Sequence, residues 1–293
     1  MKVLILGAEG FIGQNVAKVL EESHQVYRAT QSPQTESNTY IDLLKSETIA
    51  AALELVKPDA IIQCAGIVDN TEAAEQNVTF TNNLLEQVIA SGQRPKIIIS
   101  GSAGEYGSVA PEDIPVKETA PLNATSMYAV AKMKEVALAL KIRHSHSLSI
   151  TIARIFNPIG NGMGPRFLIS RILLQLSEIQ SGQREAIEVN RLDAKRDYVD
   201  VRDIGTAIKY LIENDPQHDV YNIGSGKSTT NGELINLILE NSKFNNRPVI
   251  KETSDQPEPL VAIQADISRL QQEFGWSPSV TLEDTVKEVI HGQ

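Results

Sequence analysis

The sequence predicts an α/β fold: a doubly wound parallel sheet with helices on both faces. Three observations support this. Short runs of large apolar residues, such as residues 3–6 and 97–99, alternate with longer segments of helical periodicity. The apolar runs lack polar alternation, as expected for parallel strands that are buried on both faces. A glycine-rich loop follows the first run directly. Parallel strands joined by helices require right-handed crossovers, which bring helices over both faces.

The first unit is a strand, a loop with Gly7, Gly10 and Gly13, and a helix that begins near Phe11. Such a loop lets backbone amides approach a phosphate, and the helix start adds unpaired N–H groups and a positive dipole end. Many glycine turns only join a strand to a helix. The position of this loop favours a dinucleotide pyrophosphate held by Gly7, Gly10, Phe11, Ile12 and Gly13.

The alternation continues to residue 156. Further strands are predicted at Gln25–Thr30, 39–43, 59–66, 95–100 and 149–156. Further helices are predicted at Ser46–Val56, 72–91 and 126–143. Because ligands bind at the carboxyl ends of parallel strands, the loops that follow these strands should line one site.

Beyond Asn157 the pattern becomes irregular. Short strands are predicted at Ala186–Val189 and 198–201, and a strand and turn at 220–226. Helices are predicted at 167–180, 203–214, 230–242, 266–274 and from residue 282. Asp203 is the predicted N-cap of one helix, and Thr230 with Glu233 has the spacing of a capping box. We therefore predict a cofactor-binding domain at 1–156, completed by parts of 196–225, and a smaller substrate-binding cap region at 157–293.

Composition limits the partners. With 27 Lys and Arg against 37 Asp and Glu, the net charge of −10 argues against nucleic acid or an anionic membrane as partner. No apolar run approaches the ~20 residues of a membrane helix, and the N-terminus lacks the pattern of a secretion signal, so a cytoplasmic location is expected. The single cysteine, Cys64, fits a reducing compartment. The five histidines form no cluster of metal-ligand spacing, so no metal is predicted.

Tyr128 and Lys132 are four residues apart, on one face of the predicted helix 126–143. The ordinary pKa of a tyrosine, about 10, is too high for easy proton exchange at neutral pH, and a cation one helical turn away lowers it. A phenol of this kind can protonate a carbonyl oxygen as a hydride arrives. Such a pair also arises by chance on helix surfaces. Ser102 follows the fifth strand and could hold the carbonyl oxygen beside the phenol, which favours a catalytic site.

These motifs resemble the extended short-chain dehydrogenase/reductase superfamily, and within it the nucleotide-sugar epimerase, dehydratase and reductase group. The resemblance spans nearly the whole chain and includes the segments 154–160, 196–203, 221–226 and 275–276. It implies a Rossmann-type sheet and a catalytic triad of Ser102, Tyr128 and Lys132, with Lys132 also holding the nicotinamide ribose. It implies further cofactor contacts from Asp42, Leu43, Cys64, Ala65, Gly66, Ile155 and Pro158. It implies substrate contacts from Ser102, Ala103, Glu105, Asn157, Arg166 and Arg196. Arg196 could instead form a surface ion pair with Asp197 or Asp200, and the acids from 197 to 203 are interpreted as structural.

The residues after Ser102 help to distinguish the possible reactions of the group. Dehydratases of the group carry acids directly after the triad serine or threonine, whereas this chain has Ala103 and Gly104. The segment looks most like that of reductases of 4-keto-6-deoxy nucleotide sugars, such as the GDP-4-keto-6-deoxymannose reductases. A 4-epimerase with bound NAD is the alternative enzyme, since the same triad serves both. An NADP-binding regulatory or scaffold protein is the alternative of another class, which the presence of Tyr128 and Lys132 disfavours.

The residues at the end of the second strand indicate whether NAD or NADP is preferred. NAD-preferring members place an acid there to bind the ribose 2′-hydroxyl, but this chain has Thr30, with Arg28 on the same strand face. Without a carboxylate to repel a 2′-phosphate, NADP(H) is favoured and NAD(H) is the alternative. The family often carries an arginine before a late proline where this chain has Gln256. Binding of a substrate diphosphate is then expected from Arg196, helped by Lys195, Arg166 or Arg171.

The helices at 72–91 and 126–143 carry apolar residues on more than one face. In the family that the chain resembles, these helices commonly form the four-helix bundle of a dimer, so a homodimer is expected. The same residues could equally be buried against the chain's own sheet.

Overall fold

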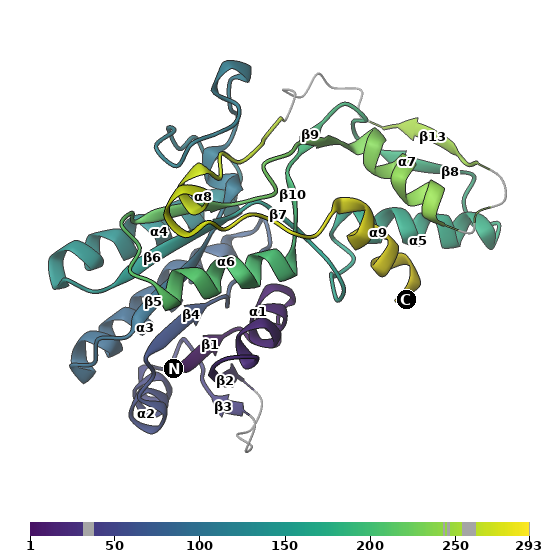
Figure 1. Cartoon of the computed structure of the whole chain (residues 1–293). Helices are drawn as coiled ribbons and strands as arrows, with labels where there is room; N and C mark the ends of the chain where they lie inside the picture. Colours follow the sequence, from purple (N-terminus) through teal and green to yellow (C-terminus); the bar gives the residue numbers. More distant parts are fainter. Residues whose placement is uncertain (32–37, 243, 245–246, 254–261, 293) are drawn as a thin grey trace.

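The computed structural model describes residues 1–31, 38–242, 244, 247–253 and 262–292 (Figure 1). Its centre is a parallel sheet of seven strands in the order β11-β6-β5-β4-β1-β2-β3. The strands are β1 (Lys2–Leu6), β2 (Gln25–Thr30), β3 (Asn38–Tyr40), β4 (Ala60–Gln63), β5 (Lys96–Ser102), β6 (Ile150–Ile155) and β11 (Val220–Ile223). The predicted doubly wound α/β fold is confirmed.

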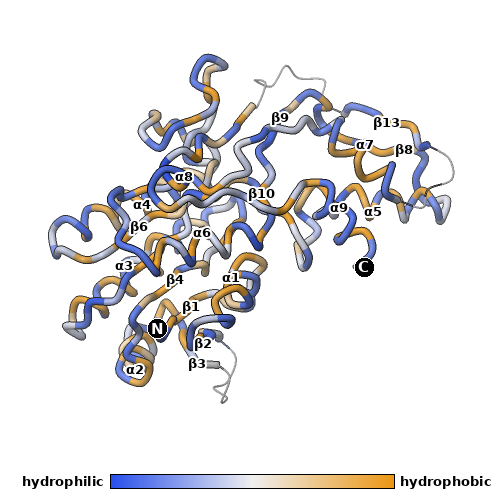
Figure 2. Tube along the Cα trace, in the orientation of Figure 1, coloured by the Kyte–Doolittle hydropathy of each residue, from blue (hydrophilic) through white to orange (hydrophobic). Residues whose placement is uncertain are grey.

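Both faces of this sheet are buried. Val3 and Ile5 of β1 belong to one apolar core, with α1 (Phe11–Glu21) and α6 (Val201–Glu213). Leu4 and Leu6 belong to a second core on the opposite face. That face is covered by α2 (Ser46–Val56), α3 (Gln76–Ser91) and α4 (Met127–His146). Figure 2 shows the resulting hydrophobic trace along β1 and β4. The uninterrupted apolar character of the strands follows from this two-sided burial.

A third apolar core gathers elements from the second half of the chain, with Ile172, Ile187, Ile235 and Val286 among its buried members. Three two-stranded sheets belong to this half: β7 (Asn157–Ile159) with β10 (Tyr198–Asp200), β9 (Lys195–Arg196) with β12 (Thr229–Thr230), and β8 (Ala186–Val189) with β13 (Val249–Glu252). Besides α6, the helices of this half are α5 (Leu168–Gln180), α7 (Asn231–Asn241), α8 (Ser268–Phe274) and α9 (Leu282–His291). In Figure 1, β8, β13, α5 and α7 lie together at one end of the molecule, away from the large sheet. The domain boundary after residue 156 stays a prediction.

Several local expectations need correction. The predicted helix 72–91 is divided into a 3-10 turn, η1 (Glu72–Glu75), and α3. Strands β7, β9, β12 and β13 were not expected, and β13 pairs in parallel with β8. Asp203 is not the N-cap of α6: the helix begins at Val201, and the carboxylate of Asp200 accepts the backbone N–H of Arg202. The capping box of Thr230 and Glu233 is confirmed.

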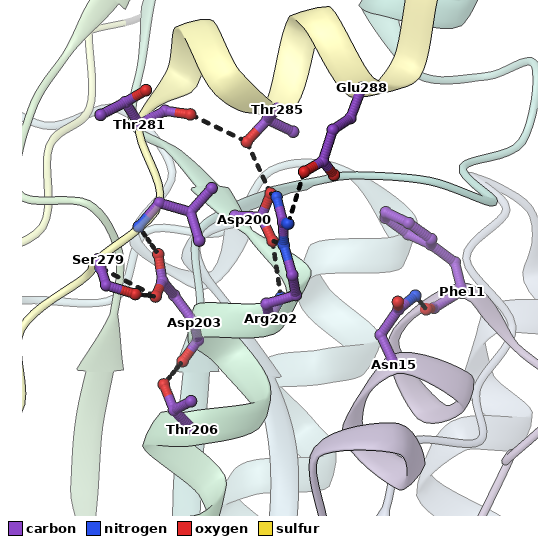
Figure 3. A network of polar contacts seen from close by, with 11 residues as sticks. Phe11, Asn15, Asp200, Arg202, Asp203, Thr206, Ser279, Thr281, Thr285 and Glu288 are labelled. Atoms are coloured by element: carbon purple, nitrogen blue, oxygen red, sulfur yellow. Dashed lines mark hydrogen bonds and ion pairs between the residues drawn. The ribbon is translucent and has the colours of Figure 1, made fainter. Parts of the chain in front are cut away.

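Asp200 also connects α6 to the C-terminal helix (Figure 3). Its carboxylate accepts hydrogen bonds from Nε and Nη2 of Arg202 and from Oγ1 of Thr285, and Nη1 of Arg202 donates to Glu288. Burial alone would raise the pKa of Asp200, but the hydrogen bonds from Arg202 and Thr285 outweigh it and hold the pKa below its ordinary value. Asp203 accepts from Ser279 and Val280 and fixes the segment before α9.

The apolar residues of α3 and α4 divide into two groups. Leu84, Leu85, Val88 and Val136 are buried in the chain's own second core, while Val78, Val130, Met133 and Leu140 are only half-buried. The first group needs no second subunit, and the homodimer stays a prediction. Within the described ranges, every helix is too short or too polar to span a membrane.

Candidate active site

The glycine loop between β1 and α1 is built for close backbone approach. Gly7 has φ +76°, and a Cβ there would lie 2.5 Å from the backbone nitrogen of Ala65. A Cβ on Gly13 would collide with the carbonyl oxygen of Gly7. The N-cap of α1 is Gly10, which has no side chain to cap the helix start. This cradle fits a pyrophosphate, since bare N–H groups and the positive helix end face the space that a phosphate would fill.

Two cavities lie beside this loop and share Gly10, Cys64 and Gly66. The first, of about 480 Å³, is lined among others by Gly7, Thr30, Leu43 and Ala65. The second, of about 470 Å³, is lined among others by Phe11, Ile12, Gly13, Ser102, Ala103, Tyr128, Ile155 and Pro158. Their shared residues make one elongated site from the end of β2 to the start of α4. An extended dinucleotide has this shape, so the residues present fit such a cofactor.

Three predicted cofactor residues do not line these cavities: Lys132, which is buried on α4, Arg28 and Asp42. Arg28 donates through Nε to Glu21 on α1 at 2.9 Å, and its Nη2 lies 2.8 Å from the same oxygen. Arg28 thus forms an ion pair with α1, and its contact with a cofactor stays a prediction. Asp42 accepts the backbone N–H of Leu44 at 3.0 Å and pairs with Lys45, so its carboxylate closes the turn before α2. Its neighbour Leu43 lines the first cavity.

Ser102 and Tyr128 line the same cavity, although they come from different elements. Ser102 ends β5, and its Oγ accepts the N–H of Gly104 at the start of the 3-10 turn η2 (Ala103–Tyr106). Tyr128 lies in the first turn of α4 and is half-buried. Lys132 lies one helical turn further along α4 and is only 6% exposed. The fold thus gathers the residues of the predicted triad at the carboxyl ends of β4, β5 and β6.

Glu105 was expected to contact substrate, but it is fully buried. Its Oε1 accepts the backbone N–H of Ser102 at 2.6 Å, and its Oε2 accepts from Nε and Nη2 of Arg154 at 3.0 and 2.8 Å. Burial would lower the pKa of Arg154, but Glu105 and Tyr106 hold it above its ordinary value. Because its carboxylate is fully engaged away from the cavity, Glu105 is a positioning residue for Ser102 and not a substrate contact.

A third cavity, of about 340 Å³, shares Asn157, Pro158, Arg166 and Phe167 with the second. Its polar lining consists of Asn157, Asn190, Asn231, Tyr198, Arg166, Arg171, Arg191 and Arg196. Among the described residues that line it there is no carboxylate. Arg191 is paired with Asp193, which lies outside this lining. The guanidinium groups of Arg166, Arg171 and Arg196 are suited to the oxygens of a diphosphate. Partial burial lowers the pKa of Arg196, with Tyr198 acting in the opposite direction.

The predicted substrate residues Asn157, Arg166 and Arg196 all line this third cavity. Sequence reasoning missed Arg191 and Asn190, which follow β8 in a segment without periodicity or a recognisable motif. It also missed Phe167, whose ring packs edge-to-face on Phe11 with centroids 5.1 Å apart. This aromatic pair connects the start of α1 to the start of α5. It thereby fixes the wall that the second and third cavities share.

Asp197, beside Arg196, has a structural role. Its carboxylate accepts from the backbone N–H and Oγ of Ser225 and from the backbone N–H groups of Gly226 and Ala265. Burial raises the pKa of Asp197 above its ordinary value, and these hydrogen bonds oppose the rise. Gln256 lies outside the described residues. Among the residues that are described, no group of His, Cys, Asp and Glu side chains has the arrangement of a metal site.

Comparison with known proteins agrees with this geometry. A model of the NAD dependent epimerase/dehydratase family matches residues 3–224. The chain belongs to this family. Its predicted membership of the extended short-chain dehydrogenase/reductases is thereby confirmed. An NAD(P) cofactor and nucleotide-sugar substrates are typical of this epimerase/dehydratase family.

Among its relatives, this family member is similar to the GDP-6-deoxy-D-mannose reductase of Pseudomonas aeruginosa, at 25% identity over 99% of the chain and 96% of the relative. The structure of RMD from Pseudomonas aeruginosa complexed with NADPH superposes with a TM-score of 0.87, at 25% identity and over 99% and 97% of the two chains. A UDP-glucose 4-epimerase from Thermotoga maritima, 23% identical, superposes with a TM-score of 0.85 over 99% and 98%. The fold is therefore common to enzymes of different reactions.

Proposed function

We propose that this chain reduces the 4-keto group of a nucleotide-linked 4-keto-6-deoxy sugar with NADPH. The observation that carries the proposal is the chemistry of the cavity containing Ser102 and Tyr128. Among the described residues that line it there is no Asp or Glu. The acid expected nearest to it, Glu105, is buried against Arg154. Elimination of water needs a carboxylate at the sugar, so dehydration has no support here, whereas reduction needs one proton donor, which Tyr128 provides.

The cofactor would be held by the glycine cradle and by the residues that line the first two cavities, and when bound it supplies a hydride to the carbonyl carbon. Tyr128 donates its phenolic proton to the carbonyl oxygen. Ser102 donates a hydrogen bond to the same oxygen and orients it toward the phenol. Lys132 places a positive charge beside the phenol, which stabilises the phenolate left after proton transfer. These roles of Ser102, Tyr128 and Lys132 belong to the proposal.

Two further features support the choice of ligands. The arginine-lined cavity meets the catalytic cavity at Asn157 and Arg166, so a diphosphate held by Arg196 could extend a sugar toward Tyr128. The cofactor cavity ends at Thr30 and Gln31, and among its described lining residues Glu9 is the one acid. Among the described residues at the end of β2, a 2′-phosphate would meet no carboxylate, which favours NADPH. The similar structure that contains NADPH is RMD from Pseudomonas aeruginosa, the organism of the similar GDP-6-deoxy-D-mannose reductase.

The test is an assay of NADPH oxidation with GDP-, UDP- and dTDP-linked 4-keto-6-deoxy sugars, with identification of the product. Tyr128→Phe should lower turnover by a factor on the order of 10² to 10⁴, because general acid catalysis is lost, while NADPH binds nearly as before. Tyr210→Phe is the matched control, since Tyr210 is an exposed tyrosine on α6. Full activity in Tyr128→Phe would refute the proposed mechanism. Interconversion of the 4-epimers of nucleotide-linked 4-hydroxy hexoses, supplied with NAD in a parallel assay and without net consumption of cofactor, would identify a 4-epimerase. Binding of NADPH without any turnover would identify a regulatory protein.

A further inference from the structure

Lys132 has a buried ion-pair partner outside the three proposed catalytic residues. Its Nζ lies 2.6 Å from Oε2 of Glu135, one turn further along α4, and Glu135 is 0% exposed. The second oxygen of Glu135, Oε1, accepts the hydroxyl of Thr81 on α3 at 2.7 Å. Thr81 is also 0% exposed. Both carboxylate oxygens are thus engaged, and the side chain is fixed from two helices.

Because Lys132 is buried, its protonation depends strongly on the carboxylate of Glu135. Desolvation acts to lower the pKa of Lys132, but Glu135, followed by Tyr128 and Glu105, raises it above its ordinary value. A further titratable group that interacts with Lys132 among the described residues is the thiol of Cys64, directly after β4. Burial raises the pKa of that thiol to about 11, so it supplies no negative charge at neutral pH. Glu105 is already paired with Arg154. Glu135 is therefore the principal counter-charge of Lys132.

We propose that Glu135, held in place by Thr81, is a positioning residue that keeps Lys132 protonated and directed beside Tyr128. The inference rests on the proposed function, because it concerns the same Tyr128–Lys132 pair. A buried ammonium without a counter-charge gives up its proton readily, since the charged form is poorly solvated. A neutral Lys132 would no longer stabilise the Tyr128 phenolate by its charge. Glu135 extends the pH range in which this pair is functional.

The decisive variant is Glu135→Gln, which keeps the side chain's size and an oxygen for Lys132 but removes the charge. A merely structural role predicts lower activity at every pH. The proposal predicts a different profile: kcat/KM for ketone reduction close to wild type in mildly acidic solution, falling to the level of Lys132→Met as the pH rises. The midpoint of this fall should lie at least about one pH unit below that of the wild type. Glu135→Asp, which restores the charge, should recover most of the alkaline activity.

Two further variants sharpen the test. Thr81→Val removes the hydroxyl that fixes Glu135 but keeps both charges, so it should shift the midpoint in the same direction by a smaller amount. Glu75→Gln breaks an exposed ion pair of equal length, 2.6 Å to Lys134 of the same helix α4, and should leave the profile unchanged. Coincident pH profiles for wild type and Glu135→Gln would overturn the proposal.

A titration without substrate separates this inference from the proposed function. The ultraviolet absorbance of the Tyr128 phenolate is obtained by subtracting the curve of Tyr128→Phe from that of each variant. In Lys132→Met the phenolate should appear at higher pH than in the wild type, because the cation is absent. Glu135→Gln should follow Lys132→Met; if it follows the wild type, the proposed role of Glu135 is wrong. A wild-type protein that reduces none of the sugars refutes the proposed function, whereas the titration still decides the role of Glu135.

Discussion

Oε2 of Glu105 accepts two hydrogen bonds from Arg154, at 3.0 and 2.8 Å, and both side chains are almost completely buried. The pair connects β6 to the turn that begins at Ser102. Nη1 of Arg154 also donates to the hydroxyl of Tyr106, which donates in turn to Asn222 of β11. A buried polar network thus runs beneath the proposed catalytic serine and crosses from η2 to two strands of the sheet.

Glu105→Gln should destabilise the protein by about 3–5 kcal/mol, because it leaves the guanidinium of Arg154 buried without its counter-charge. Denaturant unfolding at neutral pH measures this loss. Activity should fall as well, since the backbone N–H of Ser102 loses its charged acceptor. Glu112→Gln, at an exposed position in η3 (Pro111–Asp113), is the matched control and should change stability little. Equal stability of Glu105→Gln and wild type would contradict the assignment.

Arg196→Ala should raise KM for the nucleotide sugar by about 10- to 100-fold, the usual loss for a charge-assisted hydrogen bond to phosphate. KM for NADPH should stay the same, because Arg196 lines the third cavity and not the first two. Arg196→Lys should recover only part of the affinity, since an ammonium lacks the planar fork. Arg184→Gln removes an arginine that pairs with Glu178 and Glu188 outside these cavities, and should leave both constants unchanged.

Thr30→Asp should reverse the cofactor preference. A carboxylate at the end of β2 can accept from a ribose 2′-hydroxyl but repels a 2′-phosphate, so the ratio of NADPH to NADH affinity should fall by about tenfold or more. Fluorescence titration of the two reduced cofactors measures the ratio. Thr30→Asn has nearly the same shape without the charge, and it should retain the preference for NADPH. A variant Thr30→Asp that still prefers NADPH would show that some other residue selects the cofactor.

Asp200 gives the stability a defined pH dependence. The pKa of this carboxyl is held below its ordinary value in the folded protein, so its contribution is complete above the unfolded pKa and is lost as the pH falls through the folded pKa. Asp200→Asn should therefore cost about 2 kcal/mol at neutral pH, and the difference should shrink below about pH 4. Urea unfolding at several pH values measures it. Asp215→Asn, in an exposed pair with Lys96, should show little difference at any pH. A penalty for Asp200→Asn that does not change with pH would exclude this explanation.

The strands and the glycine cradle could be predicted because their signals are local. Residues 3–6 are apolar throughout, since both sides of β1 are buried, and the glycines follow within a few positions. The spacing of Tyr128 and Lys132 is equally local, since a helix places residues four apart on one face. Thr230 and Glu233 form a capping box for the same reason.

Other features depend on contacts between distant parts of the chain. The burial of Glu105 follows from Arg154, which is 49 positions away in the sequence. The partner of Arg28 is on α1, and the Glu135 carboxylate is fixed by Thr81, 54 positions earlier. The sequence alone does not distinguish a charged residue that contacts a ligand from one that pairs with a buried counter-ion. For this reason the burial of Glu105 and the ion pair of Arg28 could not be predicted, and Arg191 went unnoticed.

The position of β11 at the edge of the sheet has a consequence for the newly made chain. Strand β6 ends at Ile155, but its neighbour β11 begins only at Val220. During synthesis, the backbone N–H and C=O groups along one side of β6 have no strand partner until more than sixty further residues have emerged. An open strand edge of this kind can pair with another chain, so the interval between β6 and β11 is when the nascent protein is most exposed to aggregation and most in need of chaperone protection.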